Sequence, residues 1–276
     1  MDFREFNFLG SWVHRASRAT TVLIGGYVIA FEGTVGYTHR SIIMADRSLL
    51  RLSATLVVIG EVLFAIVTLF HAGGEDANNH PAVFAEYASS ASWIAVHFGQ
   101  FVFMAVLLLG LLVLSFALDV RSGALGWVGR FAAVSVVVAL ALYGVLQAAD
   151  GVALKHAVDA WANAPEAEKA TRFASAETVR WLEWGMNSYQ TFTFALALIL
   201  LATVIVGTAR VPRAIGYLMG LAAIPNLVQS WVVGTEGFAV PLLAGSLSTV
   251  GLPLMLAWSI WLLIVAWRMK EPAQAG

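Results

Sequence analysis

Polar side chains recur at helical spacing in four apolar stretches of this chain. The four stripes are His97 and Gln100; Tyr143, Gln147 and Asp150; Glu183, Asn187 and Gln190; and Asn226 and Gln229. Residues three, four or seven positions apart lie on one face of an α-helix, so each stripe projects from one side of its helix. Imidazole, amide, phenol and carboxylate groups arranged in this way can bind a polar molecule, a metal ion or a cofactor.

Two carboxylates belong to these stripes, and a carboxylate near hydrocarbon requires a partner. Asp150 and Glu183 can act as an acid and base pair if burial separates their pKa values. The alternative is a structural ion pair with a neighbouring cation, such as Lys155 or Arg180. Glu61 lies in the middle of a further apolar stretch, where we expect either a functional acid or a protonated, hydrogen-bonded side chain.

Histidines add a metal hypothesis. Neutral imidazoles bind transition metals and haem, and the candidate ligands are His71, His80 and His97. For His71 and His80, at the two ends of the segment HAGGEDANNH, the alternative is hydrogen bonding in solvent. The chain has no cysteine, which excludes thiolate ligands, iron–sulfur clusters and disulfides. It also lacks HxxxH and HExxH spacing, so the sequence specifies no particular metal or cofactor.

The elements that position these residues are membrane-spanning helices. Hydrophobic residues make up 59% of the 276 residues and charged residues only 12%, whereas soluble domains are about a quarter charged. A spanning helix needs ~20 mostly apolar residues. Six stretches qualify, at 49–70, 93–117, 131–153, 184–208, 214–233 and 240–267. The sequence therefore predicts an all-α, polytopic transmembrane bundle with a six-helix membrane domain over 49–267.

The basic residues orient this bundle. Of the 16 Lys and Arg residues, 12 lie at or before the start of the first stretch, after the last, or in the connections 118–130 and 209–213. By the positive-inside rule these segments are cytoplasmic. Both termini are then cytoplasmic, the tail 268–276 included, in a multi-pass protein of the cell membrane. The lipid bilayer is the expected partner, and the net charge of −1 argues against nucleic acid.

Two further segments are assigned from local signals. Residues 1–48 are predicted to form a cytoplasmic or interfacial segment because the apolar run 20–31 is short for a span; a seventh span over 20–38 is the alternative. A short extracytoplasmic helix is predicted to start near Pro165, with Asn163 as its cap. That helix either covers the bundle or continues directly into the fourth span.

All four polar stripes lie in the extracytoplasmic third of their helices. Because polar groups that face lipid are costly, the stripes should face one another or a wet cavity. The predicted binding residues of this pocket are His97, Gln100, Tyr143, Gln147, Asp150, Glu183, Asn187, Gln190 and Gln229. The loops 71–92 and 154–182 are long, polar and aromatic, and we expect them to pack together over the pocket.

Four strings of the sequence carry a resemblance to a family. They are HAGGEDANNHPAVFAEYASSASWIAVHFGQ (71–100), LQAADGVALKHAVDAWANAPEAEKA (146–170), AETVRWLEWGMNSYQ (176–190) and QSWVVGTEGFAVP (229–241). In these strings, about a third of its length, the chain resembles an uncharacterised family of bacterial multi-spanning inner-membrane proteins. The resemblance implies six helices over roughly 48–267 and assigns no activity. Ala72 departs from the family's pattern, in which proline follows the first histidine of the loop.

Three functions compete for this architecture. The first is binding of a small molecule, metal or cofactor in the extracytoplasmic pocket, with or without an enzymatic reaction. The second is a sensor or accessory membrane subunit without chemistry, in which the stripes serve packing and partner recognition. The third is a transporter, which would have its site near the midplane; the apolar inner two-thirds of the helices argue against it. A chromophore or metal bound to the purified protein would favour the first function.

Overall fold

The structure is a computed structural model that describes residues 28–238 and 242–269, with side chains from Arg47 to Phe238 and from Val250 to Met269. The chain divides into two units, Met1–Ala45 and Asp46–Gly276. In the first unit, residues 28–45 are helical. Residues 1–27 lie outside the described residues, and part of the alternative span 20–38 lies there with them.

Every element of the described part of the second unit is a helix. In chain order the helices are α2 (Val28–Thr68, which begins in the first unit), α3 (His80–Ser89), α4 (Trp93–Ala117), α5 (Gly123–Gln147), the π-helix η1 (Ala148–Leu154), α6 (Lys155–Ala162), α7 (Glu166–Thr208), α8 (Arg213–Glu236) and α9 (Leu242–Arg268). Six segments are long and apolar enough to cross a membrane: Arg47–Thr68, Trp93–Ala117, Gly123–Ala162, Glu166–Thr208, Arg213–Glu236 and Val250–Arg268. The predicted all-α bundle with six spanning helices is therefore confirmed.

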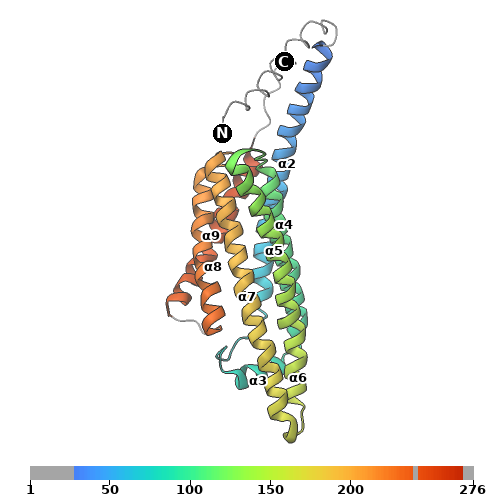
Figure 1. Cartoon of the computed structure of the whole chain (residues 1–276), viewed down its shortest axis with the longest axis vertical. Coiled ribbons are helices and arrows are strands. Elements are labelled where there is room, and N and C mark those ends of the chain that lie inside the picture. The colour runs from blue at the N-terminus through green and yellow to red at the C-terminus, as the bar shows by residue number, and fades with distance from the viewer. Residues whose placement is uncertain (1–27, 239–241, 270–276) are drawn as a thin grey trace, which may run out of the picture. The chain divides into compact units, whose positions relative to one another are not determined.

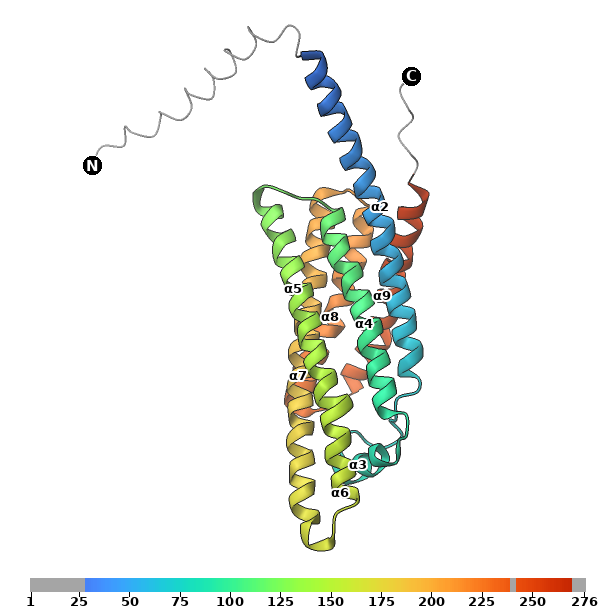
Figure 2. The same cartoon turned by 90° about the vertical axis from the view of Figure 1, so that its right-hand side faces the viewer.

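The long helices lie side by side, and the short helices gather at one end. α7 packs against both α5 and α8, α4 packs against α5, and α8 packs against α9 (Figures 1 and 2). α3 and α6 lie together at the lower end of the bundle in both views. We call this end of the bundle the α3 end. In the other half of the bundle, leucine and alanine side chains form the core, among them Leu111, Ala139 and Leu201, all fully buried. Since lipid is as apolar as leucine, close packing rather than hydrophobic transfer holds this core together.

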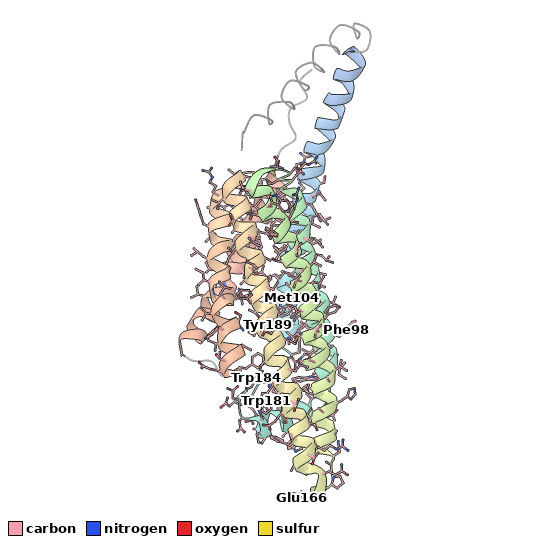
Figure 3. The ribbon with its side chains drawn as sticks, in the orientation of Figure 1. Phe98, Met104, Glu166, Trp181, Trp184 and Tyr189 are labelled. Carbon is pink, nitrogen blue, oxygen red and sulfur yellow. The ribbon has the colours of Figure 1, made fainter. Side chains whose placement is uncertain are left out.

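The continuous helical segment Gly123–Ala162, of 40 residues, and α7 are both longer than a bilayer is thick. α7 has 43 residues, or ~65 Å at 1.5 Å per residue, against ~30 Å of hydrocarbon. The predicted short helix thus continues directly into the fourth span. Figure 3 shows this continuity, with Glu166 at the tip of α7 and Trp181, Trp184 and Tyr189 farther along it.

The predicted cap of that helix is wrong. Asn163 ends α6, where its side-chain amide donates to the Asp159 carbonyl at 2.8 Å, and Pro165 occupies the N-cap position of α7. The physical reason is the tight connection between α6 and α7. Because only Asn163, Ala164 and Pro165 separate the two helices, Asn163 belongs to the end of the first and not to the start of the second.

The two loops at the α3 end pack together, as the sequence predicts. Val83 and Phe84 of α3 form one buried cluster with Leu154 of η1, Val158 of α6 and Ala176 of α7. The Lys155 ammonium group donates to the carbonyl oxygens of residues 87 and 88, at 3.0 and 2.9 Å, and so satisfies carbonyl groups at the C-terminal end of α3. α3 is therefore fixed against both α6 and α7.

Most of the described basic residues lie at the end opposite α3, while Lys155, Lys169, Arg172 and Arg180 lie at the α3 end. The Arg51 side chain donates to the Ala266 carbonyl at 3.1 Å, so the start of the first span meets the end of the last. The Arg210 guanidinium donates to the Asp119 carbonyl at 3.3 Å, which joins the connections 118–122 and 209–212. These contacts join the chain segments that the sequence assigns to one side of the bundle.

Candidate functional site

A cavity of about 470 Å³ lies among the helices at the α3 end. Eight of the nine predicted binding residues line it: Gln100, Tyr143, Gln147, Asp150, Glu183, Asn187, Gln190 and Gln229. They come from α4, α5, η1, α7 and α8, so the four stripes do turn toward a common space. The ninth predicted residue, His97, does not line the cavity but contacts it through Asp150.

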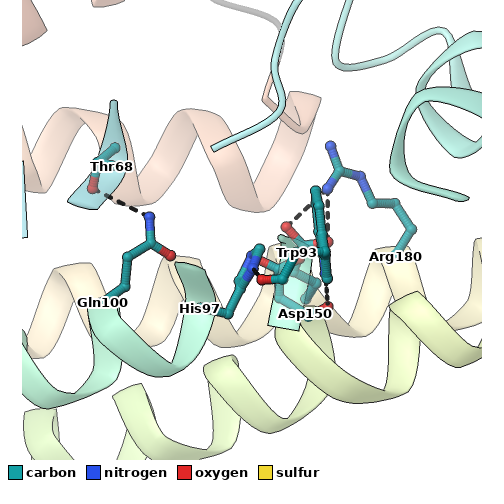
Figure 4. A network of polar contacts seen from close by, with 7 residues as sticks. Thr68, Trp93, His97, Gln100, Asp150 and Arg180 are labelled. Atoms are coloured by element: carbon teal, nitrogen blue, oxygen red, sulfur yellow. Dashed lines mark hydrogen bonds and ion pairs between the residues drawn. The ribbon is translucent and has the colours of Figure 1, made fainter. Parts of the chain in front are cut away.

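His97 and Asp150 form the central pair of this site (Figure 4). The His97 Nε2 atom lies 2.9 Å from the Asp150 Oδ2 atom, and the imidazole is 1% exposed. The other ring nitrogen, Nδ1, lies 2.7 Å from the Trp93 carbonyl oxygen. Since a carbonyl can only accept, Nδ1 carries a proton and donates it, and Nε2 is the atom that faces the carboxylate.

Trp93 holds both members of the pair. Its carbonyl accepts from His97, and its indole Nε1 donates to the main-chain carbonyl of Asp150 at 3.0 Å. Asp150 belongs to the π-helix η1, whose wider turn interrupts the α-helical course between α5 and α6. Gly151 follows Asp150, and a Cβ atom there would stand 2.5 Å from the His97 Cβ atom. The absence of a side chain at Gly151 therefore allows η1 to approach α4 closely enough for the pair to form.

His71 lies beside the pair on the loop that follows α2. Its ring centroid is 4.9 Å from those of both Trp93 and His97. Burial lowers the pKa of His71, while the Asp150 charge acts in the opposite direction and His97 adds to the lowering. Burial thus disfavours the protonated form of this imidazole.

A buried ion pair forms a second part of the cavity wall. The Arg180 Nη1 atom donates to both carboxylate oxygens of Glu183, at 2.9 and 2.7 Å, and both residues are 2% exposed. Arg180 also donates through Nη2 to the Ala77 carbonyl at 3.2 Å, and its guanidinium lies over the rings of Tyr87 and Phe238. The predicted alternative of a structural ion pair thus describes Glu183.

The second carboxylate has a different partner from the one the sequence suggested. Lys155 pairs with Asp159 at 2.9 Å, and Asp150 pairs with His97 instead. Lys155 lies about one turn farther along the chain than Asp150, toward the connection between α6 and α7, where it donates to the carbonyl groups of α3.

The amide side chains of the cavity have few partners within the protein. Gln100 donates to the Thr68 hydroxyl at 3.2 Å (Figure 4). Gln190 and Asn187 accept long hydrogen bonds from Thr191, at 3.3 and 3.4 Å. The Gln147 Oε1 atom is buried and has no hydrogen-bond partner among the described residues. This wall therefore offers donors and acceptors to a molecule in the cavity.

Two acidic or imidazole residues singled out from the sequence lie apart from this group. His80 Nδ1 lies 2.9 Å from the Glu177 carboxylate, and its ring stacks on Phe84, so the structure does not join it to His71 and His97. Among the described residues, the histidine and carboxylate groups close enough together to share an ion are His71, His97 and Asp150. Glu61 accepts a hydrogen bond from Ser259 at 2.7 Å deep in the bundle.

Sequence reasoning missed Arg180 and Tyr87 as parts of the cavity wall. Arg180 precedes Glu183 by three residues and so extends the stripe of α7 by one turn. That spacing was a usable signal. For Tyr87 the sequence contained no such signal, because this residue reaches the cavity from α3, whose position depends on the packing of the whole loop 71–92.

Comparison of the chain with protein-family models, with curated proteins and with solved structures found no match in any of the three.

Proposed function

We propose that this chain is a multi-pass membrane protein that binds a small polar molecule in the cavity at the α3 end. The observation that carries the proposal is the convergence of amide, carboxylate and guanidinium groups from several helices on one space of about 470 Å³. Ligand pockets of proteins commonly measure ~300–1,000 Å³. A hydrogen-bonding group without a partner raises the free energy of the protein by several kcal/mol at membrane depth. A bound molecule that supplies partners to the groups of this wall would remove part of that cost.

The chemistry of the wall indicates the type of ligand. Two of its charges compensate each other within the protein, in the Arg180–Glu183 pair. The amides of Gln147, Asn187 and Gln190 remain for hydrogen bonding, beside the aromatic rings of residues 64, 143, 194 and 238. A molecule with several hydrogen-bonding groups and one flat or apolar face fits this combination.

The packing beneath the cavity supports binding rather than passage. Met104 and Phe194 close the cavity toward the middle of the bundle, and the buried leucines of the core follow them. A transporter would need a continuous polar path from the cavity toward the other face. Binding from the α3 side is the simpler function for this arrangement.

The proposal predicts that a small molecule accompanies the purified protein and depends on the cavity. Membranes would be solubilised in a mild detergent, the protein purified, and its small-molecule extract analysed by mass spectrometry. Asn187→Phe, which fills the cavity from the half-buried face of α7, should remove the molecule. Thr203→Phe places the same ring on an exposed face of α7 and should retain it. Equal retention by both variants, or no cavity-dependent molecule in extracts and in a thermal-shift screen of polar metabolites, would contradict the proposal.

We further infer that the α3 end is extracytoplasmic and that both termini are cytoplasmic, because 12 of the 16 Lys and Arg residues belong to segments that the sequence assigns to the opposite side. Alkaline phosphatase fused after residue 160 should be active, and green fluorescent protein fused after residues 125 and 276 should fluoresce. An active phosphatase fusion at residue 276 would overturn this orientation.

A further inference from the structure

Two histidines and one aspartate meet at the edge of the cavity from three separate elements. His71 comes from the loop after α2, His97 from the first turns of α4, and Asp150 from η1. One ligand atom of each lies within 4.8 Å of the other two. Two histidines and one carboxylate form a set of ligands that is known for both zinc and iron(II) in proteins.

His97 Nε2 and Asp150 Oδ2 can approach this closely only if a proton or a cation lies between them, because each atom otherwise presents a lone pair to the other. Nδ1 of His97 donates to the Trp93 carbonyl, so Nε2 of the neutral ring presents its lone pair to Asp150 Oδ2 at 2.9 Å. Either a proton or a metal ion resolves this opposition. Donor atoms bound at ~2.1 Å to one ion lie about 3.0–3.4 Å apart, which is close to the separation observed.

Two independent features favour the metal ion. The second carboxylate oxygen of Asp150, Oδ1, is buried and has no hydrogen-bond partner among the described residues. Trp93 supplies the outer support that metal-binding histidines usually have, since its carbonyl fixes the His97 ring and its indole fixes the Asp150 main chain. A histidine that served only to pack would need neither the free carboxylate oxygen nor this double support.

We propose that His71, His97 and Asp150 bind one divalent first-row transition-metal ion, whose remaining coordination positions face the cavity. Both His71 and Asp150 line that cavity, and three protein ligands with open positions are characteristic of sites at which a metal holds a substrate or water. The inference deepens the proposed function and rests on it. The molecule in the cavity would offer an oxygen donor to the ion and its other groups to the amides.

The test is metal binding by the purified full-length protein in detergent, with the affinity tag removed. After treatment with a chelator and its removal, Zn²⁺ would be titrated by calorimetry, and Co²⁺ by its visible absorption spectrum. We expect one ion per chain and the spectrum of a four- or five-coordinate Co²⁺ site. His71→Gln, His97→Gln and Asp150→Asn should each weaken Zn²⁺ binding by about 100-fold or more. His80→Gln and His156→Gln should leave it unchanged.

The outcomes that would overturn the metal site can be distinguished from those that would overturn the proposed function. If the wild-type protein binds no stoichiometric Zn²⁺, or if the three ligand variants bind it like the two controls, the pair shares a proton and the metal site is refuted. The small-molecule extract is measured on the same samples, so retention of the molecule without metal binding refutes only the metal site. Asp150→Asn keeps the size of the side chain, and circular dichroism with gel filtration would verify that each variant is folded.

Discussion

Replacing Arg180 with alanine should reduce the free energy of unfolding by about 3–5 kcal/mol, because it leaves the Glu183 carboxylate buried without its partner. Both side chains are 3% exposed, and the shortest distance between them is 2.7 Å. The guanidinium also donates to the Ala77 carbonyl and lies over the Phe238 ring, so its removal frees the loop after α2 as well. The measurement is unfolding in mixed micelles by titration with sodium dodecyl sulfate, followed by tryptophan fluorescence.

The same helix offers a matched control. Arg172 pairs with Glu168 at 3.1 Å, but these side chains are 51% and 53% exposed. Arg172→Ala should therefore change the free energy of unfolding by only about 0–1 kcal/mol. Replacing both members of the buried pair, with Arg180→Met and Glu183→Leu, should restore most of the loss, because no charge then remains buried. Equal effects of Arg180→Ala and Arg172→Ala would show that water reaches the buried pair.

Sequence patterns predict the features of this protein that each helix determines by itself, namely the position of each span and the face that it turns inward. Apolar length places all six spans, and the spacing of Tyr143, Gln147 and Asp150 identifies the face that turns inward. Both follow from the cost of polar groups in lipid, which acts on each helix separately. The same rule brings eight residues from different helices to one cavity without any knowledge of their neighbours.

The pairing of side chains across helices could not be predicted in that way. Lys155 and His97 were both available to Asp150, and the choice depends on the close contact of η1 with α4 at Gly151. The grouping of His71 with His97, and the separation of His80 from both, depends on how α3 folds back onto α6 and α7. These are distances between separate elements, and one sequence contains no direct signal for them.

That contact makes Gly151 a sensitive position of the site. Gly151→Ala should lower the free energy of unfolding by about 1–3 kcal/mol, because the added Cβ atom would stand 2.5 Å from His97 Cβ and 3.1 Å from His97 Cγ. η1 and α4 would have to separate, which opens the His97–Asp150 contact. Zn²⁺ affinity should then fall by about 10–100-fold, as expected when the support of a ligand is displaced.

Gly144→Ala is the control for this substitution, on α5 two turns earlier. A Cβ atom there would meet only the edge of the Phe101 ring at 3.5 Å, an ordinary contact. Since alanine favours the helix more than glycine does, Gly144→Ala should leave stability unchanged or raise it by up to ~1 kcal/mol. The two readouts also separate the two claims, because loss of stability at Gly151 without loss of Zn²⁺ affinity would support the close helix contact and reject the metal site. If both variants behave like the wild type in both measurements, η1 does not need to approach α4 this closely.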